Sequence, residues 1–185
     1  MKLHVAHTLI LSLFVMGLIS GGASAQSTSR WTGASASGGN WTDAANWAGG
    51  APSPGNILWF PAGAARLTNT NNFPADTPFN RIDFTGTEYT LRGNRALLTG
   101  INTNLLLGNY AKVISAGFST TNRIELSILL SKTNTSVEVS IGSIATSWLI
   151  MTGDIFLTND VSCNFADGRF WHTGSISGQG RVMCQ

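Results

Sequence analysis

Two stretches near the end of the chain align without gaps: Met151-Thr-Gly-Asp-Ile-Phe-Leu-Thr-Asn-Asp-Val-Ser-Cys-Asn164 and His172-Thr-Gly-Ser-Ile-Ser-Gly-Gln-Gly-Arg-Val-Met-Cys-Gln185. Five positions are identical at one constant offset, namely Thr152/Thr173, Gly153/Gly174, Ile155/Ile176, Val161/Val182 and Cys163/Cys184. An offset of about 21 residues is close to one coil of a solenoid, in which each coil contacts only its neighbours. The repeat therefore predicts coils whose equivalent residues stack one strand spacing apart, roughly 4.8 Å.

The composition around this repeat also favours short strands joined by tight turns. Gly, Asn, Thr and Ser together supply more than a third of the chain from Gln26 to Gln185. Gly loses backbone entropy in a helix, and Asn and Ser compete for backbone hydrogen bonds. Short alternating or apolar runs recur instead, at 81–84, 89–92, 96–99, 111–115, 123–130, 136–141, 148–151, 154–157 and 161–165. The sequence predicts an all-β protein, a right-handed parallel β-helix (β-solenoid) with an N-terminal aromatic-rich cap.

The N-terminus is typical of a secretory signal. Lys2 supplies the positive charge, Leu9 to Ile19 is a short apolar run, and Ala23-Ser-Ala25 has the small-x-small form of a cleavage site. We therefore divide the chain into a signal peptide (1–25), an N-terminal cap and first coil (26–80), and solenoid coils (81–185) that carry the repeat at their C-terminal end. We expect secretion or cell-surface exposure after cleavage near Ala25, with no membrane span in the mature chain.

Charge is sparse along the whole sequence. Charged residues make up 11%, and the formal net charge is +2 with no basic or acidic run. Nucleic-acid binding needs clustered Lys and Arg, so we expect no nucleic-acid partner. A low charge suits stacked coils, because like charges at equivalent positions would lie opposite each other on adjacent strands.

Four tryptophans in residues 31–59 form the main candidate site: Trp31, Trp41, Trp47 and Trp59. Their rings could stack on sugars, with Asp43 and Asn46 bonding to hydroxyl groups. The alternative, which we favour, is a cap that covers the apolar end of the first coil. Asp43 and Asn46 could equally cap a short turn. No third oxygen has a calcium-loop spacing, so we predict no metal and no cofactor.

An enzyme would draw on scattered acids: Asp76, Asp83, Asp154, Asp160 and Asp167. Polysaccharide cleavage needs acids that converge on one groove, whereas these lie among turn residues, where Asp commonly caps the backbone. His172, the only histidine after residue 25, aligns with Met151 and is expected on a strand. We predict no catalytic residue.

Cys163 and Cys184 are the only cysteines. If they stack directly, their Cα atoms lie within the range of about 4.4–6.8 Å that a disulfide allows, and export would permit oxidation. Two reduced thiols in the core are the equal alternative.

Two stretches resemble a known family. They are a tryptophan-rich opening, with Trp31-Thr-Gly33, Ser37-Gly-Gly-Asn-Trp-Thr-Asp-Ala-Ala-Asn-Trp47, Gly49-Gly-Ala-Pro52 and Pro54-Gly-Asn-Ile-Leu-Trp-Phe60, and a closing turn, Gly174-Ser-Ile-Ser-Gly-Gln-Gly-Arg-Val182. They resemble the N-terminal portion of bacterial proteins with autotransporter-associated β-strand repeats. The resemblance implies an exported parallel β-helical passenger. Met183-Cys-Gln185 departs from the Lys-x-Gly that usually follows the repeat.

Together these observations predict a secreted or cell-surface structural passenger or stalk without catalytic activity. The alternatives are a carbohydrate-binding or adhesion module that uses the tryptophan region, and a polysaccharide-active β-helix enzyme, a lyase or a hydrolase. Partners would be surface glycans, other surface proteins, or a second copy that associates end to end.

Overall fold

The structure is a computed structural model, and it describes residues 27–100, 111–116, 121–131, 139–143, 146–158, 161–166 and 169–184. The proposed signal peptide and the acids Asp160 and Asp167 lie outside these ranges. Within them the protein is all-β, apart from one 3₁₀ turn, η1 (Ala44–Asn46). No helix among the described residues is long and apolar enough to cross a membrane.

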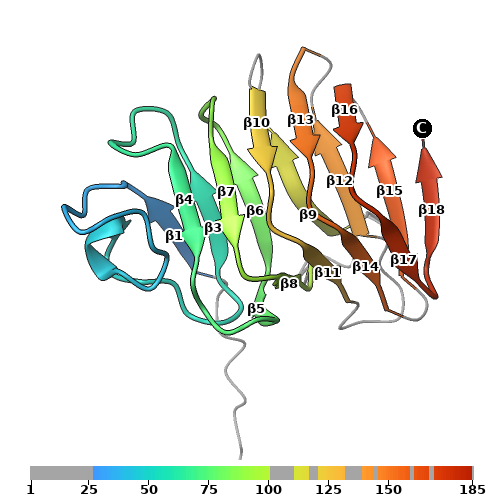
Figure 1. Ribbon diagram of the computed structural model, residues 1–185, viewed down its shortest axis with the longest axis horizontal. Helices are drawn as coiled ribbons and strands as arrows, with labels where there is room; N and C mark the ends of the chain where they lie inside the picture. The colour runs from blue at the N-terminus through green and yellow to red at the C-terminus, as the bar shows by residue number, and fades with distance from the viewer. Residues whose placement is uncertain are drawn as a thin grey trace, which may run out of the picture.

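The strands of the described ranges form three sheets, which we name A, B and C (Figure 1). Sheet A contains β1 (Thr28–Trp31), β2 (Trp47–Ala48), β3 (Ile57–Phe60), β6 (Arg81–Phe84), β9 (Ala111–Ala116), β12 (Val139–Ser143), β15 (Ser162–Ala166) and β18 (Arg181–Cys184). Sheet B contains β4 (Thr68–Asn71), β7 (Thr90–Gly93), β10 (Thr121–Ile124), β13 (Trp148–Met151) and β16 (Arg169–His172). Sheet C contains β5 (Thr77–Phe79), β8 (Ala96–Leu98), β11 (Ile128–Leu130), β14 (Ile155–Leu157) and β17 (Ile176–Gly178).

From β3 onward the chain visits the three sheets in a fixed cycle. One strand in sheet A is followed by one in sheet B and one in sheet C, and the next strand returns to sheet A. We call each passage through the three sheets a coil. Each strand pairs in parallel with the strand three places along the chain. The only antiparallel pair among the described residues joins β1 to β2, at the far edge of sheet A.

The register confirms the offset of the repeat in two sheets and corrects it in the third. Met151 pairs with His172 in sheet B, and Ile155 pairs with Ile176 in sheet C, as the aligned stretches predict. In sheet A, however, Cys163 pairs with Val182 and not with Cys184. The link from β17 to β18 is two residues shorter than the link from β14 to β15, so the predicted pairs Val161/Val182 and Cys163/Cys184 are wrong.

Gly178 lies directly before the shorter link. This residue has φ of +117°, a region that favours glycine, and its backbone packs so closely on Leu157 that an added Cβ would collide with the Leu157 carbonyl. Earlier coils also differ in length, as expected: the chain between the paired residues Ile82 and Ile114 is longer than the chain between Ile128 and Ile155. Turn length changes between coils while the strands keep their stacking.

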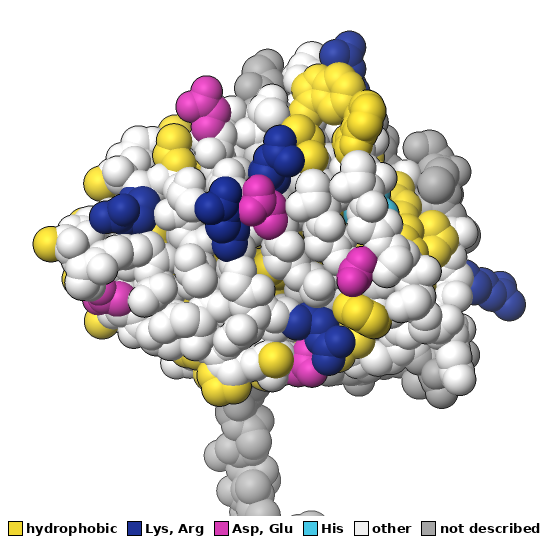
Figure 2. Space-filling model, viewed as in Figure 1, with side chains coloured by type: hydrophobic (Ala, Val, Ile, Leu, Met, Phe, Trp, Pro, Cys, Tyr) yellow, Lys and Arg dark blue, Asp and Glu magenta, His cyan; other side chains and the backbone are white. Residues whose placement is uncertain are grey.

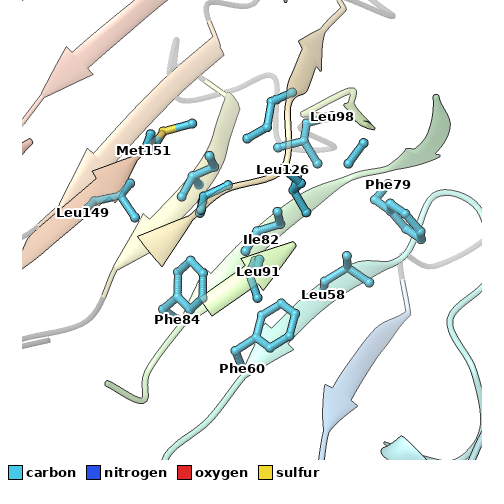
Figure 3. Packing of buried hydrophobic residues seen from close by; sticks show 14 of the residues in the cluster. Leu58, Phe60, Phe79, Ile82, Phe84, Leu91, Leu98, Leu126, Leu149 and Met151 are labelled. Atoms are coloured by element: carbon cyan, nitrogen blue, oxygen red, sulfur yellow. The ribbon is translucent and has the colours of Figure 1, made fainter. Parts of the chain in front are cut away.

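The core lies between the three sheets and consists of apolar residues stacked in register (Figure 3). Sheet A contributes Leu58, Ile82 and Ile114, which follow one another in the ladder and are completely buried. In sheet C, Ile128 and Ile155 are stacked in the same way. Each such side chain stabilises the fold by about 1.5–3 kcal/mol on burial, so the columns take the place of a helix-packed core.

Burial declines in the last coil. Ile176 stacks on the fully buried Ile155, yet it is 38% exposed, and Val182 beside the buried Cys163 is 44% exposed. The three strands of this coil, β16, β17 and β18, each form the edge of their sheet. Their outer backbone groups are therefore not paired within the described part of the chain.

Candidate functional site

Three of the four candidate tryptophans belong to an N-terminal aromatic cluster, which we define as Trp31, Trp41, Trp47, Phe60 and Phe79. Trp31 and Trp41 are fully buried and Trp47 is 4% exposed. The Trp31 and Trp47 rings meet edge to face at 4.9 Å between centroids, and Trp41 meets Phe79 at 5.8 Å in the same manner. Such pairs add stability beyond the area they bury.

Polar groups of the cluster are also satisfied internally. Trp31 Nε1 donates to the Arg66 carbonyl at 2.7 Å, Trp41 Nε1 to Asn69 Oδ1 at 2.6 Å, and Trp47 Nε1 to the Trp41 carbonyl at 2.8 Å. A ring that stacks on a sugar needs one free face. These three rings are buried, with Phe60 of β3 and Phe79 of β5 packed against them, which favours the capping alternative.

Trp59 is different, because it lies on the outer side of β3 and is partly exposed. Its Nε1 donates to Thr85 Oγ1 at 2.8 Å, and the Arg30 guanidinium lies 5.6 Å from the ring centroid. The Thr85 hydroxyl thus already accepts from the indole N–H, and the Arg30 guanidinium already lies over the ring. A sugar bound to Trp59 would use both of these contacts.

Asp43 and Asn46 close the loop that leads into β2. Asp43 caps η1 through the Ala45 amide at 3.0 Å, and its other oxygen accepts from the hydroxyls of Ser35 and Ser37. The Ser35 and Ser37 bonds, then the Ala45 amide, hold the pKa of Asp43 below its ordinary value. Both carboxylate oxygens are therefore engaged within the loop.

Asn46 is fully buried and serves the same loop. Its Oδ1 accepts from the Ser35 amide at 3.0 Å, and its Nδ2 donates to the carbonyls of Gly38 and Asn40 at 2.8 and 3.0 Å. A side chain with these partners cannot also bind a sugar hydroxyl. The hydrogen bonds of Asp43 and Asn46 therefore favour the turn-capping alternative for both residues.

The three candidate acids within the described ranges each bond to a structural partner. Asp76 forms a two-pronged ion pair with Arg95 at 2.6 and 2.7 Å, Asp83 binds Arg81 at 2.8 Å, and Asp154 accepts from the amide and hydroxyl of Ser175. The Arg95 hydrogen bond lowers the pKa of Asp76, and the Ser175 amide bond is the main cause of the lowered pKa of Asp154. A catalytic acid would require a raised pKa, which neither residue has.

His172 lies on β16, as predicted, and its Nε2 is 3.1 Å from the Gly153 carbonyl. No group of three or more His, Cys, Asp or Glu residues suited to a metal ion occurs among the described residues. The Ser175 amide and hydroxyl hold the Asp154 carboxylate, and Asp154 lies close enough to His172 for the imidazole to contribute to its lowered pKa.

The register also removes the basis of the proposed disulfide. Cys163 is buried opposite Val182, and Cys184 lies opposite Phe165. The two cysteine Cα atoms are separated by one strand spacing across the sheet and by two residues along the strand. This places them roughly 8 Å apart, beyond the disulfide limit of about 7 Å. The two-residue shortening of the final turn is the physical reason.

Exposed aromatic residues occur instead on the outer face of sheet B, which the sequence analysis did not single out. Trp148 on β13 is 36% exposed and Trp171 on β16 is 58% exposed. Figure 2 shows hydrophobic side chains beside Lys or Arg side chains on the face over β10, β13 and β16. Strand alternation contained the signal: in Trp148–Met151 the second and fourth residues are buried, so the first and third must point outward.

No family model matches the chain, and no curated protein or solved structure matches it significantly. The resemblance to autotransporter-associated repeat proteins therefore remains a prediction carried by the tryptophan-rich opening and the glycine turn.

Proposed function

We propose that this chain is a secreted or cell-surface structural protein, a passenger or stalk built as a right-handed parallel β-helix without catalytic activity. The observation that carries the proposal is the fixed cycle of strands through three parallel sheets, with apolar residues stacked in register from coil to coil. Right-handed crossovers are the general rule for parallel strands of one sheet, which supports the proposed hand.

The N-terminal aromatic cluster supports a capping role in this architecture. It lies at the edge of sheet A formed by β1 and β2, where the stack of parallel strands begins. Among the described residues the first coil has no neighbouring coil on that side, so large rings that fill its interior keep water from the apolar columns. A chain capped in this way can present outward side chains on a rigid support.

The engagement of the acids supports the absence of catalysis. Each of four aspartates bonds to the backbone of a turn or to an arginine, as Asp commonly does in structural turns. These are Asp43, Asp76, Asp83 and Asp154. For the export part of the proposal, support comes from the sequence of residues 1–25, with its charge, apolar run and Ala23-Ser-Ala25.

The test expresses the full chain in a bacterium and follows both export and activity. We expect a product outside the cytoplasm that begins near Gln26, whereas the Ala25→Leu variant should retain its leader, because the cleavage site needs a small residue. The exported product should release no fragments from a panel of neutral and acidic polysaccharides.

Two results would overturn the proposal. One is a wild-type chain that stays in the cytoplasm with residues 1–25 attached. The other is polysaccharide cleavage that is lost in Asp83→Asn or Asp154→Asn while the variant stays folded. The second result would instead establish the enzyme alternative.

A further inference from the structure

The outer face of sheet B carries two short columns of side chains whose register the ladder fixes. In the first, Thr90, Arg123, Ile150 and Trp171 follow one another on β7, β10, β13 and β16. In the second, Thr121, Trp148 and Arg169 follow one another on β10, β13 and β16. The two columns lie two residues apart on the same strands, so their side chains are neighbours on one flat surface.

Within these columns we define the tryptophan–arginine patch as Arg123, Trp148, Ile150, Arg169 and Trp171. Trp148 and Trp171 lie diagonally across adjacent strands, a separation that aromatic side chains can bridge. The Arg169 guanidinium lies 5.4 Å from the Trp148 ring centroid, which fixes the cation beside the indole. Exposed apolar groups with a polar rim typically mark a binding surface.

Arginines outnumber acids by one on this surface. Arg123 lies 3.9 Å from Glu125, but Glu125 already accepts from Arg92 at 2.7 Å, so one carboxylate serves two guanidiniums. Arg169 has no ion pair with any residue of the described ranges. Glu88 lies at the corner before β7, where its amide donates to the Thr121 carbonyl at 2.6 Å. Counting Glu88, the described residues of this surface comprise three arginines, Arg92, Arg123 and Arg169, and two acids, an excess of one positive charge.

We propose that the tryptophan–arginine patch binds an acidic polysaccharide that lies across the strands of sheet B. The indole of Trp171 stacks on the apolar face of a sugar ring, and Arg123 and Arg169 donate to uronate carboxylates. The hydroxyls of Thr90 and Thr121 continue both columns and bond to sugar hydroxyls further along the ligand. A planar guanidinium suits a carboxylate, because its parallel N–H groups match the two oxygens.

An acidic polysaccharide fits this surface better than the other extended anions. Single-stranded nucleic acid also stacks on aromatic rings, but it needs a basic groove that follows its backbone, and this chain has only 11 Lys and Arg residues in 185. An apolar peptide would use the tryptophans but not the excess of arginine. The two columns place indole rings, hydroxyls and cations side by side on one face of the sheet, which matches a chain of sugar rings that carry carboxylates.

The experiment measures binding of the purified full-length product to polygalacturonate, to its methyl ester, and to single-stranded oligothymidylate. The methyl ester keeps the sugar backbone but removes the charge. We expect wild type to bind polygalacturonate at least tenfold more tightly than the ester, and to lose affinity as salt increases, because exposed charges are screened. Trp171→Ala should weaken binding at least tenfold, and Arg169→Gln should remove most of the preference for the charged polymer.

Trp59→Ala is the matched control. Trp59 is a partly exposed tryptophan with its own arginine, Arg30, but it belongs to sheet A, so its loss should leave binding unchanged. The proposal fails if wild type does not bind polygalacturonate, if Trp171→Ala binds as wild type does, or if Trp59→Ala has an equal effect. Tighter binding of oligothymidylate also overturns it. These outcomes are independent of export and of catalysis, so they leave the proposed structural role intact.

Discussion

Replacing Trp41 by alanine should destabilise the whole coil stack, and the structure allows the loss to be estimated. The side chain is fully buried against Trp47, Phe60 and Phe79. Truncation of a buried tryptophan typically costs about 3–5 kcal/mol. It also leaves Asn69 Oδ1 without its indole donor, and a buried acceptor that loses its partner costs about 1–3 kcal/mol more.

The assay is chemical and thermal unfolding of the variants, followed by circular dichroism. A combined loss of about 4–8 kcal/mol corresponds to a fall in Tm of roughly 8–32 °C for a chain of this size. Trp41→Phe should lie between wild type and Trp41→Ala, because it keeps a ring but removes the N–H. Trp171→Ala is the control, and its exposed ring should cost no more than about 0.5 kcal/mol.

A Trp41→Ala protein that unfolds within about 0.5 kcal/mol of wild type would refute this reasoning. It would mean that the ring is not packed in the core, and it would return Trp41 to the set of exposed ligand-binding candidates.

Other substitutions and titrations test separate parts of the fold. Ile155→Ala should lower the free energy of unfolding by about 2–5 kcal/mol. Ile176 lies one coil further on and is 38% exposed, so Ile176→Ala should lower it clearly less in the same denaturant titration. Equal losses would contradict the decline of burial in the last coil. Gly178→Ala should destabilise by more than about 1 kcal/mol, because φ is +117° and the Leu157 backbone blocks a Cβ; an unchanged midpoint would show that the turn adopts another form. Burial raises the pKa of Tyr89 to about 12, and its hydroxyl donates to the Pro61 carbonyl. An absorbance titration of the folded protein should therefore show one of the two tyrosines ionising about two pH units above the ordinary value for tyrosine. The raised pKa means that the fold favours the neutral form of Tyr89. The stability that neutral Tyr89 contributes is therefore present below about pH 10 and is lost as the pH rises toward 12. Ionisation of both phenols near pH 10, before the protein unfolds, would contradict this expectation.

Much of the strand content could be predicted from local sequence. The expected strands at 81–84 and 148–151 coincide with β6 and β13, because alternation reveals which side chains point inward. The constant offset between the two aligned stretches predicted the pairing of β13 with β16 and of β14 with β17. Residues 123–130 were expected as one run, but the chain turns a corner between β10 and β11, where Leu126 remains buried.

Other features depend on contacts that local sequence does not reveal. Strand β4 reads Thr68-Asn-Thr-Asn71 and has no apolar residue, so periodicity gives no signal. Its inward residues are nevertheless buried, because Asn69 accepts from Trp41 and Asn71 donates to the Asn94 carbonyl. Such long-range hydrogen bonds compensate for burying an amide, and only the assembled coils make them visible.

The candidate site shows the same limit. Both the capping and the sugar-binding interpretations fitted Trp31, Trp41 and Trp47, because a tryptophan beside Asn and Asp suits either role. Burial by Phe60 and Phe79, from later strands, favours the capping interpretation. Trp148 and Trp171 became candidates only when register placed them on adjacent strands of one outer face.

The most direct test of the stacked coils is a set of nuclear Overhauser contacts between backbone protons of successive strands, measured by NMR on the labelled protein. We expect parallel-strand contacts between Ile155 and Ile176, between Met151 and His172, and between Cys163 and Val182 in place of Cys184. Antiparallel contacts among these strands, or no contact between Ile155 and Ile176, would contradict it.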